Sequence, residues 1–161
     1  METISGIFAA VPLDYFLLGA VAVVVALDTM RSGIGRAAAL AVALPVALLL
    51  HSLLGTTAFI GNIAALDSGM MQAAVFGAIL ALSYLLVRRM GLEYVDGGMG
   101  QPIQSLIAGV ALAVIFAVIW QESAVLGVLW QFDSPVTSLF AGSYRLFWLL
   151  GAYAALAFAR G

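Results

Sequence analysis

The sequence predicts an all-α fold, a polytopic transmembrane helical bundle of about five spans that forms one integral membrane domain over residues 1–161. Of the 161 residues, 65% are hydrophobic and only 9% are charged, and the mean hydropathy is +1.16. A typical soluble domain has about 45–50% apolar and about 25% charged residues. A single small globule cannot bury so much apolar surface, so the solvent of this chain must be lipid.

Five apolar segments have the length that a spanning helix needs, which is roughly 20 residues. None alternates between apolar and polar residues as the strands of a β-barrel do. We therefore expect spans at about residues 13–30, 37–54, 70–87, 103–120 and 137–159.

Two apolar stretches outside the spans, residues 4–11 and 123–132, could lie along the outer membrane surface. In the second stretch, Trp130 and Phe132 are typical of an interfacial helix. An apolar extension of the fourth span explains the same residues, and the sequence leaves both alternatives open.

The distribution of charged residues predicts the orientation of the chain, because arginines in short loops favour the cytoplasmic side. The arginines outside the spans follow the first, third and fifth spans: Arg31, Arg36, Arg88, Arg89 and Arg160. The acidic residues of the opposite side are Glu2, Asp14, Asp67, Glu122 and Asp133. The N-terminus should therefore lie outside and the C-terminus in the cytoplasm.

Composition also limits the function. The net charge of −2 offers no basic field to a nucleic acid. The absence of cysteine excludes disulfides, thiolate metal sites and cysteine nucleophiles. No serine belongs to a recognisable His–carboxylate pattern, and no paired aspartate or zinc motif stands in a span. We expect no enzymatic activity, no metal and no nucleic-acid partner.

Small residues recur at a spacing of four along several spans, which lets helices approach closely in lipid. The most regular ridge consists of Ser105, Gly109, Ala113 and Ala117 in the fourth span. We interpret it as the centre of the bundle or as a face for self-association. In the second span, Pro45 removes a backbone hydrogen bond and predicts a kink.

Ionisable side chains inside spans are costly and are therefore candidates for function. For Arg145 in the fifth span, the expected partners are Asp14, Glu122 or Asp133 on the same side of the membrane. The pair would clamp the fifth span to the first, or Arg145 would bind an anion or a lipid headgroup. His51 in the second span could hydrogen-bond a neighbouring helix, ligate a haem or chlorophyll, or relay protons.

The turn after the first span has its own charge pattern. Asp28 and Arg31 stand at positions i and i+3 and can pair on one helix face. The turn from Arg31 to Arg36 is short enough to make the first two spans an antiparallel hairpin, with its arginines facing anionic lipid.

Several of these motifs resemble the colicin V production protein family of bacterial inner membranes. The clearest is a Gly-Leu-x-x-x-Asp-x-x-x-Gly spacing ahead of the fourth span. Gly97 stands where that family usually has arginine, and the family is generally described with four spans. The residues that carry the resemblance are Asp14, Tyr15, Arg31, Gly33, Arg36, Gly91, Asp96 and Gly100.

The resemblance implies a role in the production or export of a peptide toxin or in envelope physiology. Because the sequence shows no catalytic pattern, we expect a non-enzymatic inner-membrane protein that is accessory to such export or to envelope homeostasis and acts by assembly. Its partners would be the lipid bilayer and either further copies of itself or other membrane subunits. Two other functions stay open. One is an oligomeric channel or transporter for ions or small solutes, with the ridge at its axis. The other is a pigment- or haem-binding subunit of an energy-conversion complex, with His51 as ligand and otherwise no cofactor.

Overall fold

The computed structural model describes residues 12–54, 68–92, 102–140, 142 and 144–159, and this part of the chain is helical with no strand. Within these residues, four helices are long and apolar enough to cross a membrane. They are α2 (Leu13–Ser32), α3 (Ile34–Leu54), α4 (Gly69–Val87), which continues as the π-helical turn η2 (Arg88–Leu92), and α5 (Pro102–Glu122). The all-α fold expected from the sequence is therefore confirmed for the described residues, and the first four expected spans match these four apolar helices.

The expectation of an unbroken fifth span at residues 137–159 is wrong. Two separate helices occupy this region. A six-residue helix, α7 (Ser134–Leu139), ends near its start, and a second helix, α8 (Tyr144–Ala159), follows. Gly142 between them has a φ of 63°, a left-handed conformation that favours glycine. With 16 residues, α8 is about 24 Å long, shorter than the hydrocarbon core of about 30 Å.

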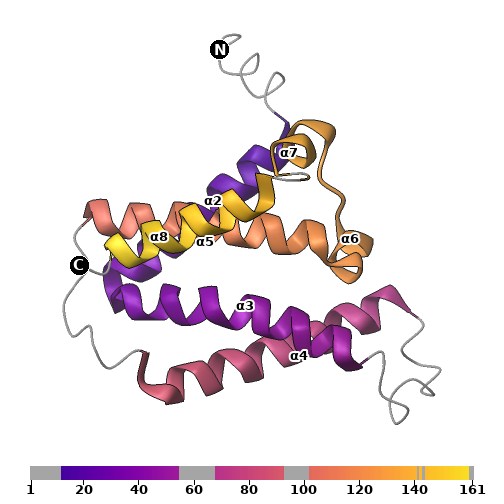
Figure 1. Cartoon of the computed structure of the whole chain (residues 1–161), viewed down its shortest axis with the longest axis horizontal. Helices are drawn as coiled ribbons and strands as arrows, with labels where there is room; N and C mark the ends of the chain where they lie inside the picture. The colour runs from indigo at the N-terminus through magenta and orange to yellow at the C-terminus, as the bar shows by residue number, and fades with distance from the viewer. Residues whose placement is uncertain (1–11, 55–67, 93–101, 141, 143, 160–161) are drawn as a thin grey trace, which may run out of the picture.

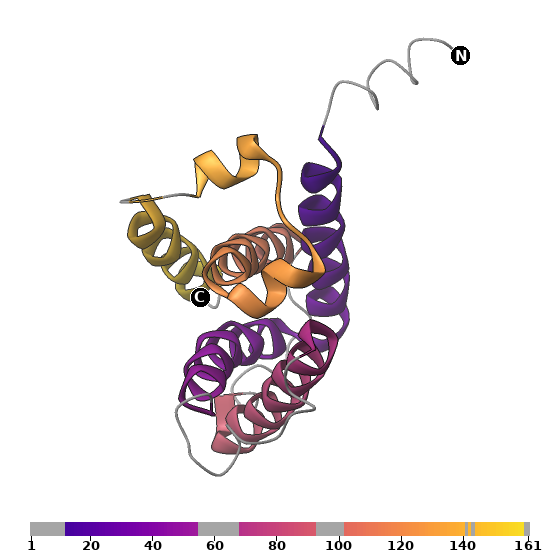
Figure 2. The same ribbon diagram turned by 90° about the vertical axis from the view of Figure 1, so that its right-hand side faces the viewer.

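Helix α5 is the centre of the bundle. It packs against α2, α3 and α8, while α4 packs mainly on the outer side of α3 (Figure 1, Figure 2). In an 18-residue apolar stretch of α5, 56% of the residues are buried. In the corresponding stretches of α2 and α4, only 17% are buried. The main core joins small and aliphatic side chains of α3, α5 and α8.

The ridge on α5 is buried inside this single chain. All four of its residues are buried, and a Cβ atom added at Gly109 would clash with the carbonyl oxygen of Ala22 and lie 3.0 Å from the Cβ of Ala26. The ridge is therefore the contact that brings α5 close to α2. Of the two interpretations, the centre of the bundle is right, and a free face for self-association is wrong because α2 covers it.

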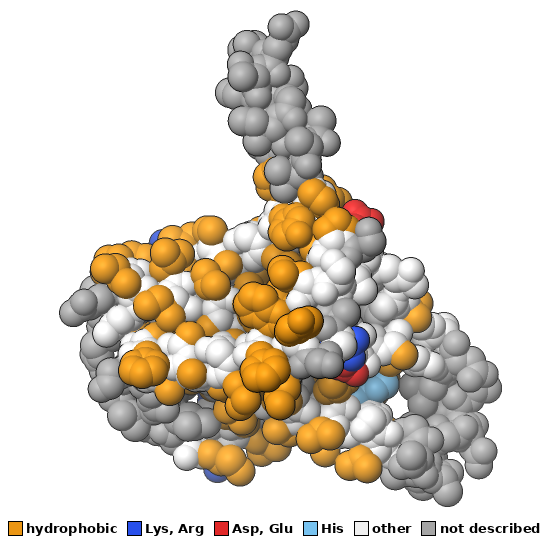
Figure 3. Space-filling view, turned by 45° about the horizontal axis from the view of Figure 1, so that its top comes forward, with side chains coloured by type: hydrophobic (Ala, Val, Ile, Leu, Met, Phe, Trp, Pro, Cys, Tyr) orange, Lys and Arg blue, Asp and Glu red, His pale blue; other side chains and the backbone are white. Residues whose placement is uncertain are grey.

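The outward faces of the helices are apolar. Val24 is 65% exposed, and the side chains of Leu49, Phe147 and Phe158 are also exposed. Figure 3 shows many apolar side chains spread over the described surface in view, with few charges among them. Such a surface is compatible with contact to lipid tails and unfavourable in water.

Residues 123–132 do not extend α5. The helix ends at Glu122, and the hydroxyl of Ser123 accepts a hydrogen bond from the amide of Leu126 to start a separate helix, α6 (Ala124–Leu129). A Cβ atom at Gly69 would clash with the side chain of Val128, so α6 rests closely on the start of α4. The extension alternative is therefore wrong. The other stretch, residues 4–11, lies outside the described residues.

Candidate functional site

The described charged side chains gather at the two ends of the bundle, because successive long helices run antiparallel (Figure 1). We call one the acidic end, which carries Asp14, Glu122 and Asp133 together with Arg145. We call the other the arginine end, which carries Arg31, Arg36, Arg88 and Arg89 together with Asp28. Each end holds a polar cluster.

At the acidic end, the carboxylate of Asp14 fastens the segment after α6 to the start of α2. Asp14 is only 1% exposed. Its Oδ1 accepts a hydrogen bond from the indole Nε1 of Trp130 at 2.9 Å, and its Oδ2 accepts one from the backbone amide of Asp133. The indole of Trp120 on α5 donates to the carbonyl oxygen of Trp130 at 2.9 Å. Two N–H donors satisfy the buried carboxylate, which otherwise would be costly.

Arg145 lies at the same end and pairs with Glu122. Its Nε also donates to the carbonyl oxygen of Phe140 at 3.3 Å. One of the three expected partners is therefore confirmed. The expected clamp between the fifth and first spans is wrong, because the pair joins the start of α8 to the end of α5.

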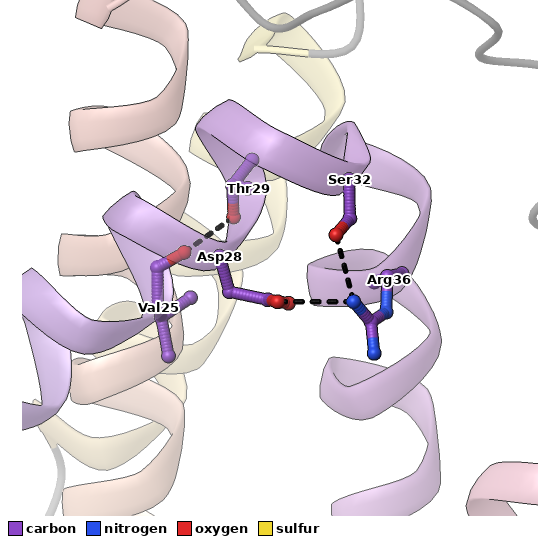
Figure 4. Close-up of polar contacts among 5 residues, drawn as sticks. All are labelled: Val25, Asp28, Thr29, Ser32 and Arg36. Atoms are coloured by element: carbon purple, nitrogen blue, oxygen red, sulfur yellow. Dashed lines mark hydrogen bonds and ion pairs between the residues drawn. The ribbon is translucent and has the colours of Figure 1, made fainter.

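At the arginine end, Arg36 closes the hairpin between α2 and α3. Its guanidinium donates to Asp28 at 3.0 Å and to the hydroxyl of Ser32 at 2.7 Å (Figure 4). The expected pair of Asp28 with Arg31 is wrong, and Arg31 is exposed. The reason is that one residue, Gly33, separates the helices, so Arg36 reaches back across the turn.

Gly33 makes this turn possible. Its φ of 84° and ψ of 163° fall in a region that is essentially open to glycine alone. Its amide donates to the carbonyl oxygen of Thr29 at 2.9 Å and so ends α2. The hydroxyl of Thr29 in turn donates to the carbonyl oxygen of Val25 at 2.6 Å (Figure 4).

The remaining motif residues near this end are only partly placed. Gly91 belongs to the π-helical turn η2, whereas Asp96 and Gly100 lie outside the described residues. The guanidinium of Arg88 stands 5.7 Å from the ring centroid of Tyr84, a cation–π distance.

His51 is half-buried near the end of α3. Its ring meets the ring of Phe76 on α4 edge to face, with centroids 5.8 Å apart. In the described part of the chain, the structure gives the ring this aromatic contact and not the expected hydrogen bond to a neighbouring helix. Among the described residues, no group of three His, Asp or Glu side chains gathers around it or elsewhere to hold a metal ion.

Two functional partners were not predicted from the sequence. They are Trp130 and Trp120, which complete the hydrogen-bond network of Asp14. Indole N–H groups are suitable donors at a membrane interface. The run of aromatic residues near 120–132 was the available signal, but pairing across more than a hundred residues has no local pattern.

No protein-family model matches this sequence, and no curated protein or solved structure is significantly similar to it. The resemblance to the colicin V production proteins therefore depends on the motif residues alone. Both clusters connect helices through ion pairs and hydrogen bonds.

Proposed function

We propose that this chain is a non-enzymatic, integral protein of a bacterial inner membrane that acts by assembly, as an accessory of peptide export or of envelope homeostasis. The observation that carries the proposal is that the polar side chains connect segments of this chain to one another. Asp14, Arg36 and Arg145 each bind a neighbouring segment of the same chain. Polar groups used in this way favour a scaffold over a chemical site.

The proposed orientation places the arginine end in the cytoplasm and the acidic end outside. Among the described residues, four arginines at one end and three acidic residues at the other support it, since positive residues are retained on the cytoplasmic side. The four helices of spanning length in the described part of the chain also agree with the span number generally described for the family that the sequence resembles.

The channel alternative has less support. It needed the ridge of α5 at an oligomer axis, and α2 already occupies that face around Gly109. An oligomer would have to use another surface of the chain.

Assembly is tested by native mass spectrometry of the protein extracted in mild detergent from its own host. The proposal predicts masses above that of one chain, 16.8 kDa, either as multiples of it or with co-released subunits. A monomer alone, at several mild detergent concentrations, contradicts assembly.

The accessory role is tested by complementation of a host strain that lacks the protein, with secreted peptide toxin and envelope permeability as readouts. Arg36→Gln should fail to complement because the hairpin loses its clamp. Arg89→Gln, an exposed arginine at the same end, is the matched control and should complement. Immunoblots of the membrane fraction establish that both variants accumulate. Full complementation by Arg36→Gln removes the support for this role.

A further inference from the structure

A cleft of about 290 Å³ lies at the acidic end, between the end of α5, the segment from α6 to α7 and the start of α8. Its volume is at the lower limit of ligand sites in proteins, about 300–1,000 Å³, so it suits a small group. Its wall combines three aromatic side chains with an amide and a guanidinium. These residues are Trp120, Gln121, Trp130, Phe132 and Arg145.

The side-chain oxygen of Gln121 is a buried acceptor that no donor in the described part of the chain reaches. The amide nitrogen of the same side chain donates to the carbonyl oxygen of Val136 at 3.4 Å, and this contact determines which end of the amide is the oxygen. Buried acceptors in native proteins are nearly always paired, and an unpaired one is costly. Since Gln121 lines the cleft, a ligand there should carry an N–H or O–H donor.

The surroundings of the cleft favour a donor that is also a cation. Counted over the described residues, three carboxylates stand against one guanidinium at the acidic end, so this end attracts cations. Arg145, the cation in the wall, is paired with Glu122, which offsets its repulsion.

Aromatic faces in the wall favour the same kind of ligand, because they attract ammonium groups. The rings of Trp120 and Phe132 stand with their centroids 6.1 Å apart. A primary ammonium group has three N–H donors, so it can donate to an oxygen while it lies against a ring.

We propose that this cleft binds a primary ammonium group, which donates to Oε1 of Gln121 beside the rings of Trp120 and Phe132. The group could come from the ethanolamine headgroup of a phospholipid or from a free amine. The position of the cleft at one end of an apolar bundle is where a headgroup would lie. The site does not depend on the export role, so failure of one proposal leaves the other standing.

The test is native mass spectrometry of the purified full chain, titrated with phosphatidylethanolamine, phosphatidylcholine and phosphatidylglycerol of the same acyl chains. Phosphatidylethanolamine should bind most tightly, because the choline headgroup has no N–H donor and the glycerol headgroup has no cation. Gln121→Leu should weaken its binding about ten-fold, the value of a hydrogen bond to a charged group. The affinity for phosphatidylcholine should not change.

Two control variants separate the loss of the acceptor from damage to the fold. Gln121→Glu also removes the amide donor of Val136, but it keeps an acceptor and adds a negative charge. It should therefore bind phosphatidylethanolamine at least as tightly as the wild-type protein. Gln104→Leu makes the same substitution near the other end of α5, outside the cleft, and should change no affinity.

Competition with free ethanolamine distinguishes the two sources of the ammonium group. Displacement of phosphatidylethanolamine by millimolar ethanolamine would show that the cleft holds the free amine as well. Persistence of the bound lipid would show that the site needs the lipid to present the group. Both results support the site and assign its source.

Four results would overturn the proposal. Equal binding of phosphatidylethanolamine and phosphatidylcholine would show that no N–H donor is recognised, as expected if only water meets the oxygen. Binding of phosphatidylglycerol as tight as that of phosphatidylethanolamine would indicate a hydroxyl ligand. Equal weakening by Gln121→Leu and Gln104→Leu would place the lipid elsewhere. Equal weakening by Gln121→Leu and Gln121→Glu would trace the effect to the lost contact with Val136.

Discussion

The hydroxyl of Tyr153 on α8 donates a hydrogen bond to the backbone carbonyl oxygen of Ala41 on α3, at 2.8 Å. Ala41 precedes Pro45 by four residues, and proline has no N–H to donate to that carbonyl. An unpaired carbonyl is costly inside a membrane protein. The tyrosine therefore compensates for the proline, and the compensation ties α8 to α3.

Tyr153→Phe should lower the free energy of unfolding by about 0.5–1.5 kcal/mol, because interhelical hydrogen bonds in membranes have this strength. Titration with a denaturing detergent in mixed micelles measures the change. In a Pro45→Ala background, which restores a backbone donor, the same substitution should cost clearly less. Equal costs in both backgrounds would show that the hydrogen bond does not compensate for the proline.

Gly109→Val should destabilise the bundle by about 1–3 kcal/mol, as overpacking typically does. The new side chain would collide with the backbone of α2 at Ala22, which cannot move aside as a flexible side chain could. Gly77→Val is the matched control, since a Cβ atom there meets no atom within 4 Å. Unfolding titrations of both variants measure the change in the free energy of unfolding. Similar losses of stability in the two variants would contradict the close crossing of α2 and α5.

Gly33→Ala should cost about 1–3 kcal/mol of stability, because an alanine would be strained at the backbone angles of Gly33. Gly19→Ala, in open space within α2, should instead stabilise slightly through better helix propensity. In the same thermal-unfolding assay, Gly33→Ala should lower the Tm and Gly19→Ala should raise it slightly. A neutral Gly33→Ala would mean that the hairpin adopts a different turn.

Asp14→Asn should loosen the acidic end without unfolding the bundle, since charge-assisted hydrogen bonds to Trp130 and Asp133 contribute about 1.5–3 kcal/mol. Hydrogen exchange should become faster at the amide of Asp133, and the fluorescence of Trp130 should shift to the red. Asp28→Asn, at the opposite end, should leave both signals unchanged. Unaltered exchange in Asp14→Asn would contradict the role assigned to this carboxylate.

The spans were predictable because hydropathy alone determines them, and the ends of the first four agree within three residues, including Pro102 in the first turn of α5. The broken fifth span was missed because an average over many apolar residues hides a short turn. Gly142 was the local signal for that turn.

The polar contacts were less predictable than the helices. The i, i+3 spacing within one helix predicts Arg31 as the partner of Asp28. The connection to the next helix is only one residue long, however, and it brings Arg36 close enough to form the ion pair instead. The contact of Asp14 with Trp130 joins residues 116 positions apart, and no periodicity encodes such a pair. Secondary structure follows from local patterns, whereas these contacts follow from how the helices pack.

The most direct test of a membrane-spanning bundle with its arginine end in the cytoplasm is cysteine accessibility. The natural chain has no cysteine, so single-cysteine variants carry no background. Gln131→Cys and Met90→Cys place thiols at exposed positions of the acidic and arginine ends. In intact cells, a membrane-impermeant maleimide should label Gln131→Cys only, and Met90→Cys should react after permeabilisation. Labelling of Met90→Cys in intact cells, alone or together with Gln131→Cys, would contradict this topology.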